Sequence, residues 1–176
     1  LLTKGCILAE DGIKNNDFYK LTEAEKIFEN LYKRRPNAVH AYNYANTISK
    51  LNKPIEAEKL YKFALKLDSN YAEAWKNLGQ VYYDLKKHEQ EIKCYNKALS
   101  IKPDLFQATI SKAITTGFIY CKYKQSLKDI LSIIDKQPSV FSEFPVIYYW
   151  LGYFYFKIKN ISEGLGWINK GLSNNP

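Results

Sequence analysis

Residues 71–104 read YAEAWKNLGQVYYDLKKHEQEIKCYNKALSIKPD, and this stretch decides the fold of the chain. Four of its residues recur at spacings of three and four and therefore share one face of a helix: Trp75, Leu78, Gly79 and Tyr82. A second set follows and ends on a helix-terminating proline: Tyr95, Ala98 and Pro103. The stretch therefore predicts two helices joined by a short turn.

The pattern Trp-x2-Leu-Gly-x2-Tyr with a terminal proline, in a unit of about 34 residues, resembles the tetratricopeptide repeat (TPR) family. The resemblance implies an all-α fold, a right-handed α-solenoid of about five TPR helical hairpins. One hairpin cannot bury its apolar face alone, so neighbouring repeats must stack.

The same frame, moved along the chain, predicts a single TPR domain over residues 1–176. Its repeats are expected at 1–37, 38–71, 72–105, 106–138, where the pattern is degenerate, and 145–176, which ends on Pro176. The first repeat is expected to contain an enlarged polar loop from Glu10 to Lys20. In the third, Glu91 stands where other repeats carry a small residue, and we expect its carboxylate to reach water.

The charge of the chain favours an acidic partner over nucleic acid. Residues 1–88 carry 15 basic and 11 acidic side chains and residues 89–176 carry 11 and 7, so each half contributes +4 to the net charge of +8. Only two of the 26 cations are arginine, the residue that favours base and bidentate phosphate contacts. We therefore expect a protein or peptide partner, possible self-association, and no nucleic acid.

The cysteines and the termini bear on location. Cys6, Cys94 and Cys121 are odd in number and far apart, which suits reduced thiols and predicts a cytoplasmic, intracellular protein. The sequence begins at Leu1 and contains no methionine, so we expect a fragment of a longer protein. No apolar run approaches the ~18 residues that a membrane span needs.

Catalytic motifs do not occur in the sequence. It contains no nucleophile elbow, glycine-rich phosphate loop, HExxH or CxxC, and its two histidines, His40 and His88, lie far from any cluster of cysteines. We therefore expect no enzyme activity, no cofactor and no metal.

The resemblance places the binding surface on the first helix of each repeat, which lines a concave groove. At the groove positions of the second and third repeats, six residues are expected to bind a peptide: Tyr42, Asn43, Asn46, Lys76, Asn77 and Gln80. Side-chain amides both donate and accept, so they can hold the main chain of an extended peptide without reading its sequence. Residues 74–85 are similar to the TPR superhelix of O-GlcNAc transferase, whose repeats carry asparagine at the same place. Alternatively, these asparagines reflect an asparagine-rich composition on a solvated helix face.

A second binding mode of the family is a clamp for the carboxy-terminal aspartate of chaperone tails. The clamp uses the first helices of three consecutive repeats and requires cations on the last of the three. This chain has Gln107 and Ser111 there, and only an alternative frame would bring Lys112 into the site. Chaperone-tail binding is therefore disfavoured.

The last repeat predicts a different surface, because its first helix is aromatic nearly all round. Four aromatic residues project at groove positions and form a possible interface: Tyr149, Trp150, Tyr153 and Phe156. Such a helix is usually covered by its neighbours. The alternative is an aromatic pocket or a self-association face.

Together these patterns predict a protein-interaction scaffold that binds an extended peptide segment of a partner in its concave groove. Two alternatives are a structural or oligomerisation module that associates through the aromatic C-terminal repeat, and a regulatory TPR arm of a larger enzyme.

Overall fold

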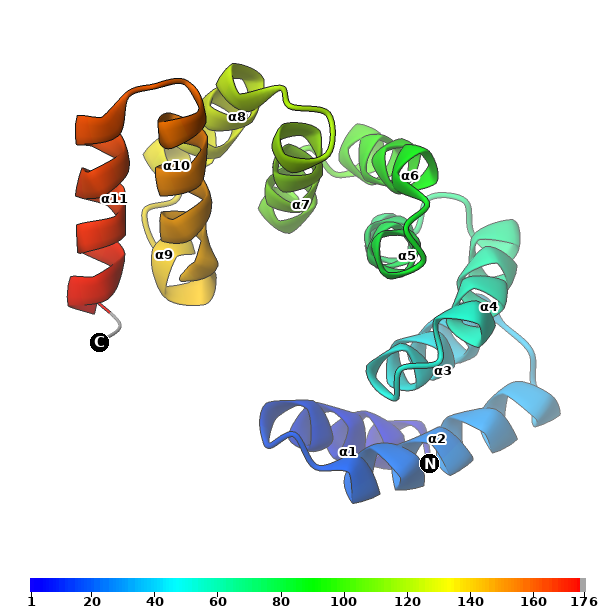
Figure 1. The fold of residues 1–176 in the computed structure, drawn as a ribbon. Coiled ribbons are helices and arrows are strands. Elements are labelled where there is room, and N and C mark those ends of the chain that lie inside the picture. The colour runs from blue at the N-terminus through cyan, green and yellow to red at the C-terminus, as the bar shows by residue number, and fades with distance from the viewer. Residues whose placement is uncertain (175–176) are drawn as a thin grey trace. The chain divides into compact units, whose positions relative to one another are not determined.

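The computed structural model describes residues 1–174, which form eleven α-helices and, within that range, no strand (Figure 1). The helices are α1 (Leu2–Lys14), α2 (Phe18–Arg34), α3 (Ala38–Lys50), α4 (Pro54–Leu67), α5 (Ala72–Asp84), α6 (His88–Ile101), α7 (Phe106–Phe118), α8 (Tyr123–Lys136), α9 (Val140–Glu143), α10 (Val146–Lys157) and α11 (Ile161–Asn174). The predicted all-α class is confirmed. The terminal proline at position 176 lies outside the described residues.

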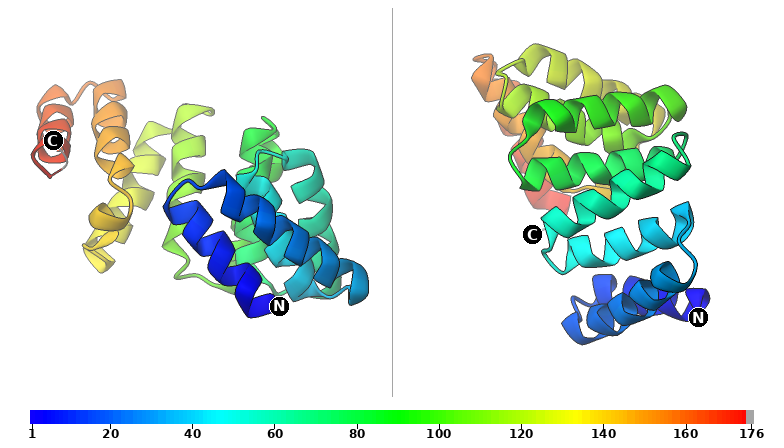
Figure 2. Two further views of the ribbon diagram at one scale, coloured as in Figure 1. Left: turned by 90° about the horizontal axis from the view of Figure 1, so that it is seen from below. Right: turned by 90° about the vertical axis from the view of Figure 1, so that its right-hand side faces the viewer.

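The chain divides into two compact units, Leu1–Pro103 and Asp104–Pro176. Unit 1 consists of three helical hairpins, α1/α2, α3/α4 and α5/α6, in which each second helix packs on the first helix of the next hairpin (Figure 2, right). The first helices also contact one another: α1 contacts α3, and α3 contacts α5. Side chains that line one surface of these three helices therefore come within reach of one another.

The core of unit 1 lies between its helices, and Leu78 of the repeat pattern belongs to it. Its buried members include Ala45, Ile48, Ala57, Tyr61, Ala74, Leu78 and Val81. Gly79 is necessary in this core, because a Cβ atom on it would lie 2.6 Å from Cε1 of Tyr95. The glycine of the pattern thus allows α5 and α6 to approach closely.

Unit 2 contains two hairpins, α7/α8 and α10/α11, and the short helix α9 between them. Helix α10 packs on α8, and Ile147, Leu151 and Phe154 of α10 are fully buried there. Helix α9 occupies the predicted spacer. Its Phe141 ring stacks on Tyr148 of α10 at 4.3 Å and on Trp167 of α11 at 5.7 Å between centroids, which fixes the spacer against the last hairpin.

Every hairpin turn contains one residue in the left-handed region. These residues are Asn16, Asn52, Lys86, Cys121 and Lys159, with φ between 51° and 64°. In the second hairpin, the N–H of Lys53 donates to the carbonyl of Ile48 over 3.0 Å, which closes the end of α3 in a Schellman-type arrangement. Four of the turns share this geometry, and the turn after α7 is one residue longer and closes with a hydrogen bond from the N–H of Lys122 to the carbonyl of Thr116.

The enlarged loop expected in the first hairpin is wrong. Helix α1 continues to Lys14 and α2 begins at Phe18, so the turn is as short as the turns after α3 and α5. Gly12 lies inside α1 and packs against Leu21, because a Cβ on Gly12 would lie 2.9 Å from Cγ of that leucine. Gly12 is therefore required for the close packing of α1 on α2, and the backbone of the turn does not require it.

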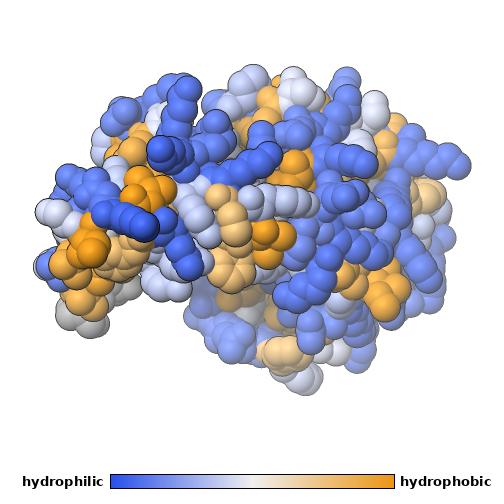
Figure 3. Space-filling view, turned by 45° about the horizontal axis from the view of Figure 1, so that its top comes forward, coloured by the Kyte–Doolittle hydropathy of each residue, from blue (hydrophilic) through white to orange (hydrophobic). Residues whose placement is uncertain are grey.

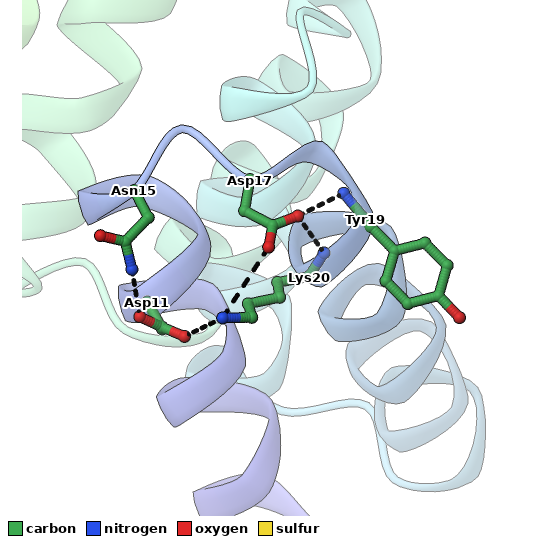
Figure 4. Close-up of polar contacts among 5 residues, drawn as sticks. All are labelled: Asp11, Asn15, Asp17, Tyr19 and Lys20. Carbon is green, nitrogen blue, oxygen red and sulfur yellow. Dashed lines mark hydrogen bonds and ion pairs between the residues drawn. The ribbon is translucent and has the colours of Figure 1, made fainter.

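Polar side chains in the same segment cap α2 and tie it to α1, rather than forming a loop (Figure 4). The Asp17 carboxylate accepts hydrogen bonds from the N–H groups of Tyr19 and Lys20 over 2.9 and 3.2 Å. The Lys20 ammonium pairs with Asp11 of α1 and lies 3.8 Å from the second Asp17 oxygen. Acidic residues at a helix start are favoured because they accept from its free N–H groups.

The expectation that the Glu91 side chain reaches water is also wrong. Glu91 is 1% exposed, and its Oε2 lies 2.9 Å from Nδ1 of His88. Helix α6 begins at His88, so this ring lies one turn earlier on the same face and covers the carboxylate. A buried carboxylate is tolerated at the position of a small residue because a polar partner comes with it.

Candidate functional site

Two asparagines on neighbouring first helices form the centre of the candidate site in unit 1. Asn77 of α5 donates through Nδ2 to Oδ1 of Asn46 on α3 over 2.8 Å and to the hydroxyl of Tyr42 over 3.3 Å. The hydroxyl of Tyr61 donates to the same Asn46 oxygen over 2.5 Å. The other ends of the two amides, Oδ1 of Asn77 and Nδ2 of Asn46, take no part in these bonds.

Three tyrosine rings hold the amide pair in place. Tyr42 lies with its ring centroid 4.5 Å from that of Tyr71 and 6.1 Å from that of Tyr61. Burial raises the pKa of all three phenols, to about 12 for Tyr71. Their hydroxyls therefore stay protonated and neutral at physiological pH, and they remain able to donate hydrogen bonds.

Lysines concentrate positive charge beside the amides. Burial lowers the pKa of Lys76; the charge of Glu73 partly offsets this, and the charges of Lys50 and Lys102 lower it further. Lys102 pairs with Glu73 over 3.1 Å, and its hydrogen bond is the main reason that the pKa of Glu73 is lowered. Lys76 and Lys102 both act on the Glu73 carboxylate and Lys50 acts on Lys76, so the cations of this part of unit 1 outnumber its carboxylate.

The structure gathers some of the six predicted peptide-binding residues and not others. Tyr42, Asn46 and Asn77 form the cluster described above, and Lys76 precedes Asn77 in α5. Gln80 is exposed, and its Nε2 lies 3.4 Å from Oδ1 of Asp84. Asn43 is half-buried, and its main-chain carbonyl accepts from the Thr47 hydroxyl over 3.0 Å. That all six bind a peptide stays a prediction.

Sequence reasoning missed the members of the site that come from outside the first-helix groove positions. Tyr61 lies in α4, the second helix of its hairpin, and Tyr71 precedes α5. A tyrosine at a buried position brings a hydroxyl that needs a partner, and this signal could have linked Tyr61 to the amides. Lys50 and Lys102 lie at helix ends, where lysine is ordinary.

The aromatic residues of α10 divide into two environments within unit 2. Trp150 and Tyr153 are half-buried, and the Phe118 ring of α7 covers them at centroid distances of 5.5 and 6.0 Å. Tyr149 is 54% exposed and stacks on Tyr153 at 6.3 Å. Phe156 lies over α11, where a Cβ on Gly164 would be 2.5 Å from its ring. That this surface joins copies of the chain stays a prediction.

Comparison with known proteins identifies the repeats. The family model for the tetratricopeptide repeat matches residues 72–105, the two helices α5 and α6. The chain belongs to the tetratricopeptide repeat family. TPR proteins generally mediate protein–protein interactions, and the match falls on the hairpin that supplies Lys76 and Asn77.

Relatives of this TPR chain are considerably longer proteins. Protein O-mannosyl-transferase TMTC3 of Homo sapiens is 32% identical over 124 residues, which is 68% of this chain and 13% of the relative. The Mus musculus protein of the same name is 29% identical over 157 residues, 87% of this chain and 16% of that one. The chain thus spans less than one fifth of the length of these relatives.

A solved structure supports the fold class. The crystal structure of MamA superposes with a TM-score of 0.75 at 18% identity, covering 92% of each chain. At this identity the likeness concerns the fold alone, and it agrees with an α-solenoid built from TPR hairpins. The narrower similarity to O-GlcNAc transferase stays a prediction.

The described residues provide neither a metal-binding cluster nor a membrane-spanning helix. Among residues 1–174, no three His, Cys, Asp or Glu side chains are grouped so that they could hold a metal ion. No helix in that range is both long enough and apolar enough to cross a membrane. The three cysteines are free, with Cys94 buried and Cys121 exposed.

Proposed function

We propose that unit 1 is a scaffold that binds an extended, acidic peptide segment of a partner protein along α3 and α5. The observation that carries this proposal is the hydrogen bond between Asn46 and Asn77, because it fixes one amide donor and one amide acceptor on neighbouring first helices. An extended main chain presents an N–H and a C=O at regular intervals and fits such a pair. Oδ1 of Asn77 would accept from the peptide, and Nδ2 of Asn46 would donate to it.

The charge around Lys76 supports an acidic segment. Burial is the main cause that lowers the pKa of Lys76; Glu73 opposes this effect, and Lys50 and Lys102 add to it, so a carboxylate of the peptide would favour the charged form of the ammonium. Charge-assisted hydrogen bonds are stronger than neutral ones, and they gain from partial exclusion of water. A basic segment would add a fourth positive charge and is rejected.

The proposed role requires no bond-making chemistry. We infer that the chain is not itself an enzyme and acts by holding its partner, as TPR proteins generally do. The intracellular location expected from the free cysteines belongs to this proposal, because reduced thiols persist in a reducing compartment.

Lys76→Met provides the sharpest test. Methionine keeps most of the apolar stem and removes the half-buried charge, so the folded state should be as stable as the parent or slightly more stable. Extended peptides that differ only in charge, composed of serine with either glutamate or lysine and labelled with fluorescein, would be titrated in fluorescence anisotropy. We expect the glutamate peptide to bind more tightly than the lysine peptide, and Lys76→Met to weaken it about five- to tenfold.

The matched control is Lys93→Met, which removes an exposed lysine of α6. This variant should bind the glutamate peptide like the parent, apart from a small change that salt removes. Equal affinity for the two peptides, or equal losses in Lys76→Met and Lys93→Met, would refute recognition of an acidic segment at α3 and α5.

A second candidate function is that the chain is a non-catalytic arm of a larger enzyme. The similarity to Protein O-mannosyl-transferase TMTC3, confined to 13% of the human protein, favours it. An antiserum raised against residues 1–174 would test it on blots of the source cells. A polypeptide much longer than 176 residues is expected, and a band of this length would argue against it.

A further inference from the structure

The segment between the two hairpins of unit 2 departs from the repeat pattern. The connections between the hairpins of unit 1 contain three or four residues, whereas residues 137–145 separate α8 from α10. Two prolines, Pro138 and Pro145, bound the short helix α9 in this segment, and Val140 of α9 is fully buried. The segment is therefore a fixed addition to the stacked hairpins.

Helix α9 holds a group of aromatic rings against the last hairpin. The Phe141 ring stacks on Tyr148 of α10 and on Trp167 of α11, with interplanar angles of 19° and 21°. The hydroxyl of Tyr148 accepts a hydrogen bond from Nδ2 of Asn174, the last residue of α11, over 3.1 Å. The ring and the hydroxyl of Tyr148 are thus both held, and this residue presents a rigid aromatic surface.

Two depressions in the surface of unit 2 meet at Tyr148. Pro145 and Tyr148 line both of them. The first, of about 530 Å³, extends to Phe141, and the second, of about 350 Å³, extends to Tyr149 and Leu172. In the space-filling view, apolar side chains gather at the left edge, over the C-terminal helices (Figure 3). Each depression has the volume of an ordinary ligand pocket.

The lining of both depressions is uncharged. None of the residues that line them is an aspartate, glutamate, lysine, arginine or histidine, although 25% of the residues of the chain are charged. A charged side chain would lose its water there without gaining an ion pair. The depressions therefore fit an uncharged segment, unlike the lysine-rich site of unit 1.

The Tyr148 hydroxyl restricts the conformation of that segment. It accepts from Asn174, and its own hydrogen meets no acceptor among residues 1–174. A docked α-helix would bury this O–H group without an acceptor, because its carbonyls are already bonded within the helix. A β-strand needs a row of main-chain partners, and the main chains of α10 and α11 are occupied in the same way. A polyproline II segment has free carbonyls, lacks N–H groups at its prolines, and packs its rings on aromatic side chains.

We propose that Tyr148 and the two depressions that meet at it bind a proline-rich segment in the polyproline II conformation. Proline rings of the segment pack in the depressions, and one of its carbonyls accepts a hydrogen bond from the Tyr148 hydroxyl. This site lies within unit 2 and shares no residue with the acidic-peptide site proposed for unit 1, so either proposal can fail without the other.

A proline decamer labelled with fluorescein tests the site by fluorescence anisotropy with the full chain. We expect it to bind at least tenfold more tightly than a glycine–serine decamer that carries the same label. Leu172→Glu places a charge in the second depression and should weaken binding of the proline peptide about tenfold. Leu165→Glu makes the same change at an exposed leucine of α11 that lines neither depression, and it should bind like the parent.

Tyr148→Phe keeps the ring and removes the hydroxyl. It should weaken binding of the proline peptide about three- to tenfold, the effect of one hydrogen bond, and leave the far-UV circular dichroism unchanged. Tyr19→Phe, at an exposed tyrosine of α2, is its control. Equal affinity for the two decamers, or equal losses in Leu172→Glu and Leu165→Glu, overturns the proposal. So does a dimer of the parent chain that Leu172→Glu dissociates, because a second copy then occupies the depressions.

Discussion

Asn77 of α5 donates a hydrogen bond to the side-chain oxygen of Asn46 on α3 over 2.8 Å, and this bond joins two first helices that belong to successive hairpins. Both asparagines are half-buried, so their hydrogen bond contributes to the stability of the fold as well as to the proposed binding. A substitution there changes both properties. This is why Lys76, rather than either asparagine, separates binding from folding.

Asn77→Ala is expected to destabilise the protein by about 1 kcal/mol, the usual net contribution of a partly buried hydrogen bond. Urea unfolding followed by far-UV circular dichroism measures the change. Gln80→Ala, three places further along α5 and exposed, is the matched control and should lie within about 0.5 kcal/mol of the parent. An Asn77→Ala variant as stable as Gln80→Ala would mean that the amide pair is not formed in solution.

Two glycine-to-alanine changes are expected to have opposite effects. Gly79→Ala places a Cβ 2.6 Å from the Tyr95 ring and should destabilise the protein by about 1–3 kcal/mol through overpacking. Gly166→Ala in α11 meets nothing within 4 Å and should stabilise it by about 0.5–1 kcal/mol, because alanine favours a helix. Thermal unfolding of the two variants gives the comparison. A neutral Gly79→Ala would contradict the close approach of α5 and α6.

The ion pairs of Glu58 predict a dependence on pH. Burial alone would raise the pKa of Glu58, but hydrogen bonds from Lys62 and Lys87 outweigh it and lower that pKa. A lowered pKa in the folded state contributes stability that is present above the unfolded value, about 4.3, and is lost as pH falls through the folded value. The advantage of the parent over Glu58→Gln should therefore be below about 1 kcal/mol at pH 7 and shrink toward zero below about pH 4.

Urea midpoints measured between pH 3 and pH 7 check this expectation. Glu89→Gln, which removes an exposed carboxylate of α6, serves as the reference for a simple change in net charge. An advantage that grows on acidification would have the wrong sign for a carboxylate stabilised by cations.

The three thiols are expected to react at very different rates. Burial raises the pKa of Cys94 to about 12, and burial also raises that of Cys6, whereas Cys121 is exposed in the turn after α7. Alkylation depends on the thiolate, so iodoacetamide at pH 8 should modify Cys121 first and Cys94 only after unfolding. Peptide mass spectrometry follows each site. Rapid modification of Cys94 in the folded protein would contradict its place in the core.

The repeat pattern predicted the hairpins because packing between paired helices fixes residue type at constant spacing. Trp75, Leu78 and Gly79 could be recognised since each must fit a neighbouring helix. The family resemblance then supplied the order in which hairpins stack. The first hairpin was misjudged because Asp11 and Gly12 are typical turn residues. In the structure, Gly12 leaves room for the Leu21 side chain and Asp11 forms an ion pair with Lys20.

The candidate site was only partly predictable for a related reason. Asn46 and Asn77 are 31 positions apart, so they do not occupy equivalent places, and periodicity cannot show that their side chains meet. The phenol of Tyr61 completes the network from a second helix. Glu91 was misjudged for a similar reason. His88 can be recognised as its partner only when it is known that this face of α6 is buried.

The ion pairs on the outer side of α1 bear on aggregation. Open-ended fibres require every copy to offer two complementary faces, one of which receives the other. Helix α11 exposes Ile161, Leu165 and Leu172. If α1 received these residues from another copy, Lys4 and Asp11, which pair with Glu23 and Lys20, would be buried against them at a cost of several kcal/mol per ion. The chain can therefore keep one apolar face exposed without polymerising head to tail.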